Sequence, residues 1–233
     1  MGSASQRSTR GRRSGGRAPG KRAGRVGAPC LVMLVRHGKT STTGSVLPGR
    51  APGLHLSDQG VAQAEAVAAR IAPTEPAAIY ASPMERTRET AAPIARATKL
   101  RTRTADGLLE CDFGDWTGQK LSVLRRRKEW SAVQNTPSVF RFPGGESFPE
   151  MNQRIWQQLQ DLASRHPGER IVAVSHADPI KAAVATASGT HLDNFQRTVI
   201  SPCSVSAILI GAGTPIVLCV NNTGDDLTTL AVS

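Results

Sequence analysis

The sequence predicts an α/β fold, a three-layer α/β/α sandwich around a mostly parallel six-stranded sheet. Three observations support this fold class. Unbroken apolar runs such as Leu31–Val35 and Ile171–Val174 are typical of strands that are buried on both faces. Segments with apolar residues at helical spacing separate these runs, as in βαβ units. Polar residues follow directly where the runs end, and ligands bind at the carboxyl ends of strands in sheets of this kind.

The chain of 233 residues is long enough for one domain with flanking segments. Residues 1–28 are basic and low in complexity, and we expect this N-terminal tail to be disordered. Residues 29–222 are predicted to form the domain, and residues 223–233 a solvated C-terminal end. The tail holds eight Arg and Lys residues and no acid, so only +3 of the net charge of +11 belongs to the rest of the chain.

Composition also limits partners and location. No run of about 18 apolar residues is present, so we predict no membrane span and no membrane partner. A nucleic-acid partner is not expected beyond the basic tail, where no aromatic residue interleaves the cations. A homodimer through a sheet edge is compatible with the sequence. Reduced thiols in a cytoplasmic protein are expected, because four cysteines lie far apart without metal-ligand spacing: Cys30, Cys111, Cys203 and Cys219.

Strands and helices alternate through the first half of the domain. Ser57 is a good N-cap, and Pro73 marks the end of the helix that it starts. Pro93 inside the second helix predicts a kink or an early end. The predicted order is a strand over Leu31–Val35, a helix from Ser57, a strand over Ala77–Ala81, a helix over Met84–Ala97 and a strand over Leu100–Thr104.

The second half begins with an acid-rich loop over Gly107–Gly118 and a short, very basic helix over Gln119–Trp130. The charge run Arg125–Lys128 in this helix is expected to face solvent rather than to bind a second phosphate. An amphipathic helix, a buried strand and a closing hairpin follow. The amphipathic helix is predicted over Glu150–Arg165 and the buried strand over Ile171–Val174, and a further helix over Pro179–Ala187 comes before the hairpin. The hairpin strands are predicted over Val205–Ile210 and Ile216–Val220.

Cationic and imidazole side chains follow the predicted strands, where they would converge on one crevice. Arginine suits a phosphate dianion because its planar fork gives bidentate hydrogen bonds and keeps its charge. Arg36 and Arg86 are the candidates. Two guanidinium groups would lower the pKa of a neighbouring imidazole, so His37 would be neutral and nucleophilic. A backbone carbonyl on one ring nitrogen would leave the other free to attack.

Two further side chains would complete phosphoryl chemistry. His176 is expected to carry a proton and to donate it in a hydrogen bond to the phosphate oxygens. Glu110 would protonate the leaving oxygen and then accept a proton from water, with a pKa raised by a crevice that Phe113 and Trp116 wall. Taken singly, each residue except His37 is better explained by a structural role. Their joint occurrence at strand ends favours one phosphate-handling site.

The chain resembles the histidine phosphatase superfamily, the phosphoglycerate mutase-like proteins, over about Leu31 to Val220. Four features in the family's order carry the resemblance: LVRHGKT, SPMERTRETA, LLECDFGDWTG, and PGGES with VSHAD. The segments DNFQRTVISPCSVSAI and VNNTGDDLTTL resemble a narrower actinobacterial group of phosphomutases or phosphatases. The resemblance implies a mixed sheet with one antiparallel edge strand and no metal or other cofactor. It also implies a phosphohistidine on His37, a phosphate pocket of Arg36, Arg86 and His176, and Glu110 as proton donor.

Two departures from the family concern substrate binding. Mutases usually carry Asn six residues after the nucleophile, where this chain has Thr43, whose hydroxyl would replace the amide. Ala177 stands where glycine is commoner and would tighten the pocket floor. The substrate contacts expected from the resemblance are Arg36, Thr40, Thr43, Gly49, Arg50, Arg86, His176 and Ala177.

The sequence therefore predicts a metal-independent phosphatase that acts on a small phosphorylated metabolite. A phosphoglycerate mutase-type phosphomutase is the alternative enzyme. It needs a closing lid, and the short segment between Gly118 and Gly144 favours the phosphatase. An alternative of another class is a non-catalytic phosphate-binding regulator or nucleic-acid tether. The complete set of candidate catalytic residues argues against it.

Overall fold

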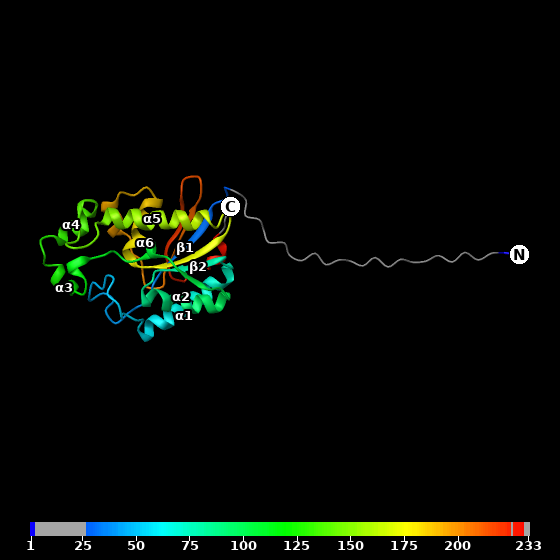
Figure 1. Cartoon of the computed structure of the whole chain (residues 1–233), viewed down its shortest axis with the longest axis horizontal. Helices are drawn as coiled ribbons and strands as arrows, with labels where there is room; N and C mark the ends of the chain where they lie inside the picture. The colour runs from blue at the N-terminus through cyan, green and yellow to red at the C-terminus, as the bar shows by residue number, and fades with distance from the viewer. Residues whose placement is uncertain (3–26, 225, 231–233) are drawn as a thin grey trace.

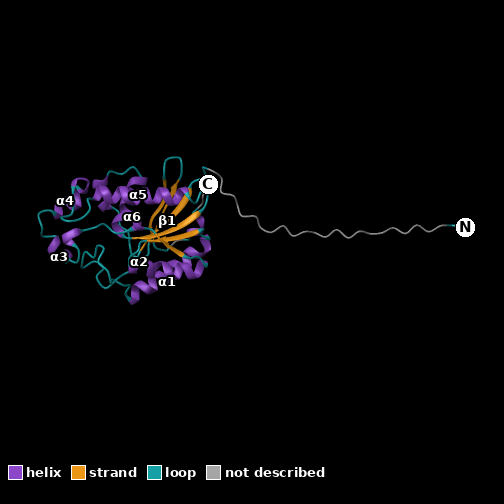
Figure 2. Ribbon diagram, in the orientation of Figure 1, coloured by secondary structure: helices purple, strands orange, loops and turns teal. Residues whose placement is uncertain are grey.

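The computed structural model describes residues 1–2, 27–224 and 226–230, and its sheet confirms the predicted fold class. Six strands lie in the order β3-β2-β4-β1-β5-β6, with helices on both faces (Figure 1, Figure 2). The strands are β1 (Cys30–Arg36), β2 (Ala78–Ala81), β3 (Thr102–Thr104), β4 (Arg170–Ser175), β5 (Val205–Ile210) and β6 (Ile216–Asn222). Apart from β6 and the short β3, the strands are apolar and buried, as a sheet covered on both faces requires.

Two pairs of helices enclose the sheet. The pair α1 (Asp58–Ile71) and α2 (Glu85–Thr98) covers one face, and α5 (Phe148–Ser164) and α6 (Ala177–Ala187) cover the other (Figure 1). Ser57 caps α1 as predicted, because its side chain accepts from the Gly60 amide. Helix α2 continues through Pro93 to Thr98, close to the predicted end at Ala97, so Pro93 does not end the helix early. Burial of Ala91 and Ile94 in the core offsets the hydrogen bond that the proline removes.

One strand runs against the others. Strands β3, β2, β4 and β1 pair in parallel, whereas β5 pairs antiparallel with both β1 and β6. The implied antiparallel edge strand is therefore wrong in position, because β5 lies inside the sheet and β6 forms the edge. All residues of β5 are buried, whereas exposed residues alternate along β6. Strand β5, the more apolar strand of the hairpin, thus lies in the interior of the sheet.

The basic helix predicted over Gln119–Trp130 is much shorter than expected. Helix α3 (Leu121–Leu124) ends before the charge run, and α4 (Trp130–Asn135) begins after it. All side chains of Arg125–Lys128 are exposed, which agrees with a solvated face. The chain turns at this charge run between the two short helices. The guanidinium of Arg127 lies 5.4 Å from the centre of the Trp116 ring.

The described part of the C-terminal end packs on the domain. Leu227 is buried in the cluster between the sheet and helices α1 and α2, which corrects the predicted solvated end at this residue. Residues 225 and 231–233 of that predicted end, and residues 3–26 of the tail predicted to be disordered, lie outside the described residues.

Two findings bear on location. Among the described residues no helix combines the length and apolarity needed to cross a bilayer. All four cysteines have free thiols. The cytoplasmic location stays a prediction.

Candidate active site

The carboxyl ends of three neighbouring strands place the candidate side chains together. The β1–β4 register sets Arg36 beside Ser175, and the His37 amide donates to the Ser175 carbonyl at 3.0 Å. The Ser82 amide, directly after β2, donates to the Val174 carbonyl at 3.0 Å. The rings of His37 and His176 consequently lie 5.2 Å apart, centre to centre. Parallel pairing alone thus brings two imidazoles from distant segments into one site.

His37 is held as a neutral imidazole with one free nitrogen. Its Nδ1 lies 2.8 Å from the Gly38 carbonyl, so Nδ1 carries the proton and Nε2 has an open lone pair. Burial, followed by the charges of Arg86 and Arg36, lowers the pKa of His37 from 6.5 to about 3. A Cβ on Gly38 would lie 2.6 Å from the Gly60 carbonyl oxygen, which explains the glycine after the histidine.

Two guanidinium groups lie beside His37. Arg36 Nη1 donates to the Ile200 carbonyl at 2.6 Å, and Arg86 Nη2 donates to the Gly49 carbonyl at 2.8 Å. Other donors in this group are buried and have no partner among the described residues, namely Arg36 Nε, Arg86 Nε, Arg86 Nη1 and His176 Nδ1. Unpaired buried donors cost free energy, so this site suits an anion with several acceptor oxygens.

Glu110 supplies a carboxyl group that holds its proton near neutral pH. The side chain is buried, and its Oε1 accepts from the Cys111 amide at 2.9 Å. Burial, followed by the negative charge of Asp178, raises the pKa of Glu110 from 4.5 to about 7, although Arg86 acts in the opposite direction. Phe113 lines the cavity beside it. A carboxyl in this state can give a proton and take it back.

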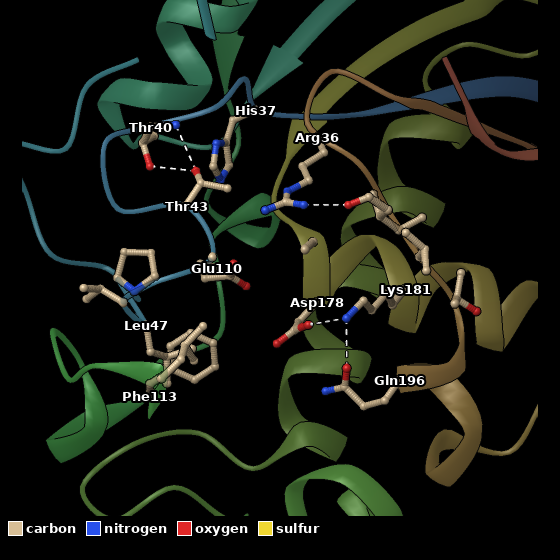
Figure 3. Close-up of a pocket in the computed structure, with 18 residues that line it drawn as sticks. Arg36, His37, Thr40, Thr43, Leu47, Glu110, Phe113, Asp178, Lys181 and Gln196 are labelled. Atoms are coloured by element: carbon tan, nitrogen blue, oxygen red, sulfur yellow. Dashed lines mark hydrogen bonds and ion pairs between the residues drawn. The ribbon is translucent and has the colours of Figure 1, made fainter. Parts of the chain in front are cut away.

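A cavity of about 360 Å³ opens in front of these groups (Figure 3). Thr40 and Thr43 lie on its wall, with the Thr43 hydroxyl accepting from the Thr40 amide at 2.9 Å. Arg86 and His176 are fully buried behind the wall. Of the sequence-predicted residues, those that line the cavity are Arg36, His37, Thr40, Thr43, Glu110 and Ala177.

Residues 32–223 match the family model of the histidine phosphatase superfamily, branch 1. The chain belongs to this superfamily. An uncharacterised protein of Mycobacterium tuberculosis is 36% identical over 154 residues, which are 64% of this chain and 74% of that protein. Phosphoserine phosphatase 1 of Hydrogenobacter thermophilus is 29% identical over 197 residues, 82% of this chain and 92% of that protein. YhfR of Bacillus stearothermophilus has a similar structure, with a TM-score of 0.78 at 26% identity over 84% of this chain and 98% of that one. The protein is therefore an enzyme of the histidine phosphatase superfamily.

In this histidine phosphatase the surroundings of His176 favour the neutral imidazole over the imidazolium, and its role as a donor to the phosphate oxygens stays a prediction. Burial lowers the pKa of His176 well below 6.5, and Arg86 adds to the effect. A second proton would place another charge among two buried cations. His176 Nε2 lies 2.9 Å from the Ser82 hydroxyl. When Ser82 donates to Nε2, the ring proton resides on Nδ1, which is the nitrogen without a partner.

Arg50, a predicted substrate contact of the histidine phosphatase, holds the acid loop instead. Its Nε donates to the Glu110 carbonyl at 2.8 Å, and its Nη2 lies 2.8 Å from a Glu146 oxygen. Arg154 pairs with the same glutamate and donates to the carbonyls of Gly107 and Leu109. Both arginines are thus occupied in fixing the segment that carries Glu110. Gly49 likewise does not line the cavity and accepts from Arg86.

Several residues of this histidine phosphatase site were missed from the sequence. Asp178 and Lys181 follow His176 at positions that share a helix face, and that spacing is a signal that points to them. Residues 196–200 follow a predicted helix and carry no such signal. The missed residues that line the cavity include Asp178, Lys181, Gln196, Thr198, Val199 and Ile200.

Proposed function

We propose that the protein is a metal-independent phosphatase that hydrolyses small phosphate monoesters through a phosphohistidine on His37. The observation that carries the proposal is that Arg36, Arg86 and His176, which lie beside His37, have buried N–H groups without a partner among the described residues. The three equatorial oxygens of a transferring phosphoryl group would satisfy these donors. The two guanidinium groups supply the positive charge that phosphoryl transfer needs.

The first step forms the phosphoenzyme. His37 Nε2 attacks the phosphorus in line with the leaving oxygen, so the P–N bond forms as the P–O bond breaks. Glu110 gives its proton to the leaving oxygen, and the alcohol departs neutral. The unpartnered donors stabilise the charge that develops on the equatorial oxygens.

The second step hydrolyses the phosphohistidine and regenerates the free enzyme. The carboxylate of Glu110 takes a proton from a water molecule, whose oxygen attacks the phosphorus as the P–N bond breaks. Phosphate leaves, His37 regains its free nitrogen, and Glu110 is again protonated. A pKa of about 7 suits both roles, because either form is accessible near neutral pH.

Phosphate release in the presence of EDTA tests the proposal. We expect an aryl phosphate to be hydrolysed at the same rate with and without EDTA, and 3-phosphoglycerate not to be converted to its 2-isomer. Isomerisation would make the protein a phosphomutase. No release from a panel of monoesters, with phosphate still bound, would support a non-catalytic phosphate-binding protein.

The pH dependence follows from the raised pKa of Glu110. Since the protonated form donates, kcat on alkyl phosphates should fall as pH rises above about 7. No loss from protonation of His37 is expected until pH approaches about 3. Steady-state rates measured from acid to alkaline pH would check this. A rate that stays constant well above neutral pH would contradict the role of Glu110.

Substitution of Ser82 by alanine tests the tautomer of His176. The change removes the hydroxyl hydrogen bond to Nε2, so we expect kcat to fall by about tenfold with little change in KM. Ser82→Thr keeps the hydroxyl and should restore much of the rate. Ser204→Ala is a matched control, because that buried hydroxyl has no partner among the described residues. Equal kcat for wild type and Ser82→Ala would refute this positioning role.

A further inference from the structure

A polar cluster lies in the cavity on the side away from His37. Asp178 and Lys181 extend from the first turns of α6, and Gln196 comes from the 3₁₀ segment Leu192–Arg197 (Figure 3). Lys181 Nζ lies 3.2 Å from Asp178 Oδ1 and donates to Gln196 Oε1 at 2.8 Å. The side chains of Asp178 and Lys181 are 17% and 16% exposed, so the ion pair is largely withdrawn from water. We call these three residues the α6 cluster.

The α6 cluster has unused hydrogen-bonding groups. The second carboxylate oxygen of Asp178 and the amide nitrogen of Gln196 have no partner among the described residues, and both are directed toward the cavity in Figure 3. Lys181 uses two of the three N–H groups of its ammonium. The cluster therefore presents a negatively charged acceptor beside positively charged and neutral donors.

Apart from the proposed proton donor Glu110, the opposite wall of the cavity is largely apolar. It is formed by the apolar side chains of Leu47, Pro48, Phe113 and Leu121. Arg36 is engaged with the Ile200 carbonyl and faces the proposed phosphate position. Among the described residues that line the cavity, Asp178 and Lys181 are thus the charged side chains that the proposed catalytic steps do not use.

We infer, on the basis of the proposed phosphatase function, that the α6 cluster selects monoesters whose leaving alcohol is a zwitterionic α-amino acid. The ammonium would bind Asp178, and the carboxylate would bind Lys181 and the amide of Gln196. The ammonium and the carboxylate of an α-amino acid are bonded to the same carbon and so lie close together, as do Asp178 and Lys181, whose charged groups are 3.2 Å apart. Each charge then faces its opposite, and charge-assisted hydrogen bonds form on both sides.

Other charge patterns fit the α6 cluster less well. A substrate with a carboxylate alone brings it close to Asp178, and one with an ammonium alone brings it close to Lys181. Like charges in a site with little water destabilise such complexes. A neutral polyol gains only the weaker neutral hydrogen bonds. Selectivity therefore arises from the pairing of both charges.

Four alkyl phosphates with different charges test the inference. O-Phosphoserine carries both charges, 3-phosphoglycerate the carboxylate, phosphoethanolamine the ammonium, and glycerol phosphate neither. We expect kcat/KM for O-phosphoserine to exceed that of each other substrate by at least about tenfold. Asp178→Asn should remove most of the preference over 3-phosphoglycerate, and Lys181→Met most of the preference over phosphoethanolamine.

Controls separate recognition from folding. Asp161→Asn and Lys99→Met change charges on the exposed surfaces of α5 and at the end of α2, and should leave all four ratios unchanged. Lys181→Met keeps an apolar stem near the Phe195 ring, and thermal unfolding checks that it folds. Gln196→Ala gives an independent test, because it removes one carboxylate donor without altering α6.

The outcomes distinguish this inference from the proposed function. The inference would be overturned if kcat/KM for glycerol phosphate equalled that for O-phosphoserine. It would also be overturned if the variants of the α6 cluster lowered kcat/KM for all four substrates equally. In either case hydrolysis of p-nitrophenyl phosphate by the wild type would leave the proposed phosphatase standing. Failure on p-nitrophenyl phosphate as well would refute the proposed function itself.

Discussion

Replacing His37 with alanine should abolish phosphate release from every monoester, with kcat falling at least about a thousandfold, or roughly 4 kcal/mol of barrier. Its Nε2 is the open nucleophilic nitrogen beside the buried guanidinium groups. His176, the other imidazole of the site, is hydrogen-bonded through Nε2 to Ser82 and is aligned as a donor. The loss should appear in kcat, because the phosphate-binding donors remain in the variant.

A phosphoenzyme measurement makes the His37 experiment specific. Acid-quenched wild type should retain little label from a ³²P-labelled substrate, whereas alkaline quenching should preserve it, since the P–N bond is acid-labile. His37→Ala should retain none under either condition. His191→Ala serves as a control, because that side chain is exposed. Activity of His37→Ala within about tenfold of wild type, roughly 1.4 kcal/mol, would refute the nucleophile assignment.

The second large effect concerns Glu110→Gln. Glutamine retains an oxygen that can accept from the Cys111 amide, but it has no acidic proton. We expect kcat on alkyl phosphates to fall by about 10² to 10⁴, since a poor leaving group departs only when it is protonated. On an aryl phosphate the loss in the first step should be below about tenfold, because that alcohol leaves as an anion.

Leaving-group dependence is the measurement that checks this. A plot of log kcat/KM against the pKa of the leaving alcohol should be flat for wild type and steep for Glu110→Gln. Glu129→Gln is a matched control on an exposed residue. Equal losses on alkyl and aryl phosphates would mean that Glu110 shapes the site without donating a proton.

The sequence was informative where function depends on strand ends. Arg36-His37 and Ser175-His176 each follow a buried apolar run, and parallel pairing of such runs brings their ends together whatever lies between them. The proximity of the two histidines could therefore be predicted. The sequence also located Glu110, because the acid loop LLECDFGDWTG resembles that of the superfamily.

The rest of the site depends on contacts that a sequence does not specify. Arg50 binds Glu146, which is far away along the chain, so nothing local distinguished a loop brace from a substrate ligand. The lowered pKa of His176 follows from complete burial and from the charge of Arg86, and burial of this degree is a tertiary property. Gln196 reaches the cavity only because its 3₁₀ segment packs next to α6.

The hydrogen bond between Arg36 and the Ile200 carbonyl links the part of the site that would hold the leaving alcohol to the part that holds the nucleophile. Residues 196–200 border the space for the leaving alcohol, while Arg36 lies beside the nucleophile. A leaving alcohol that displaced this segment would also move the carbonyl to which the Arg36 guanidinium donates. Poor substrates should therefore be bound and turned over slowly, so that discrimination is expressed in kcat more than in KM. Exchange of residues 196–200 between relatives would then alter catalytic efficiency together with substrate range. A redesign of specificity in this segment would need to keep the Ile200 carbonyl in its position.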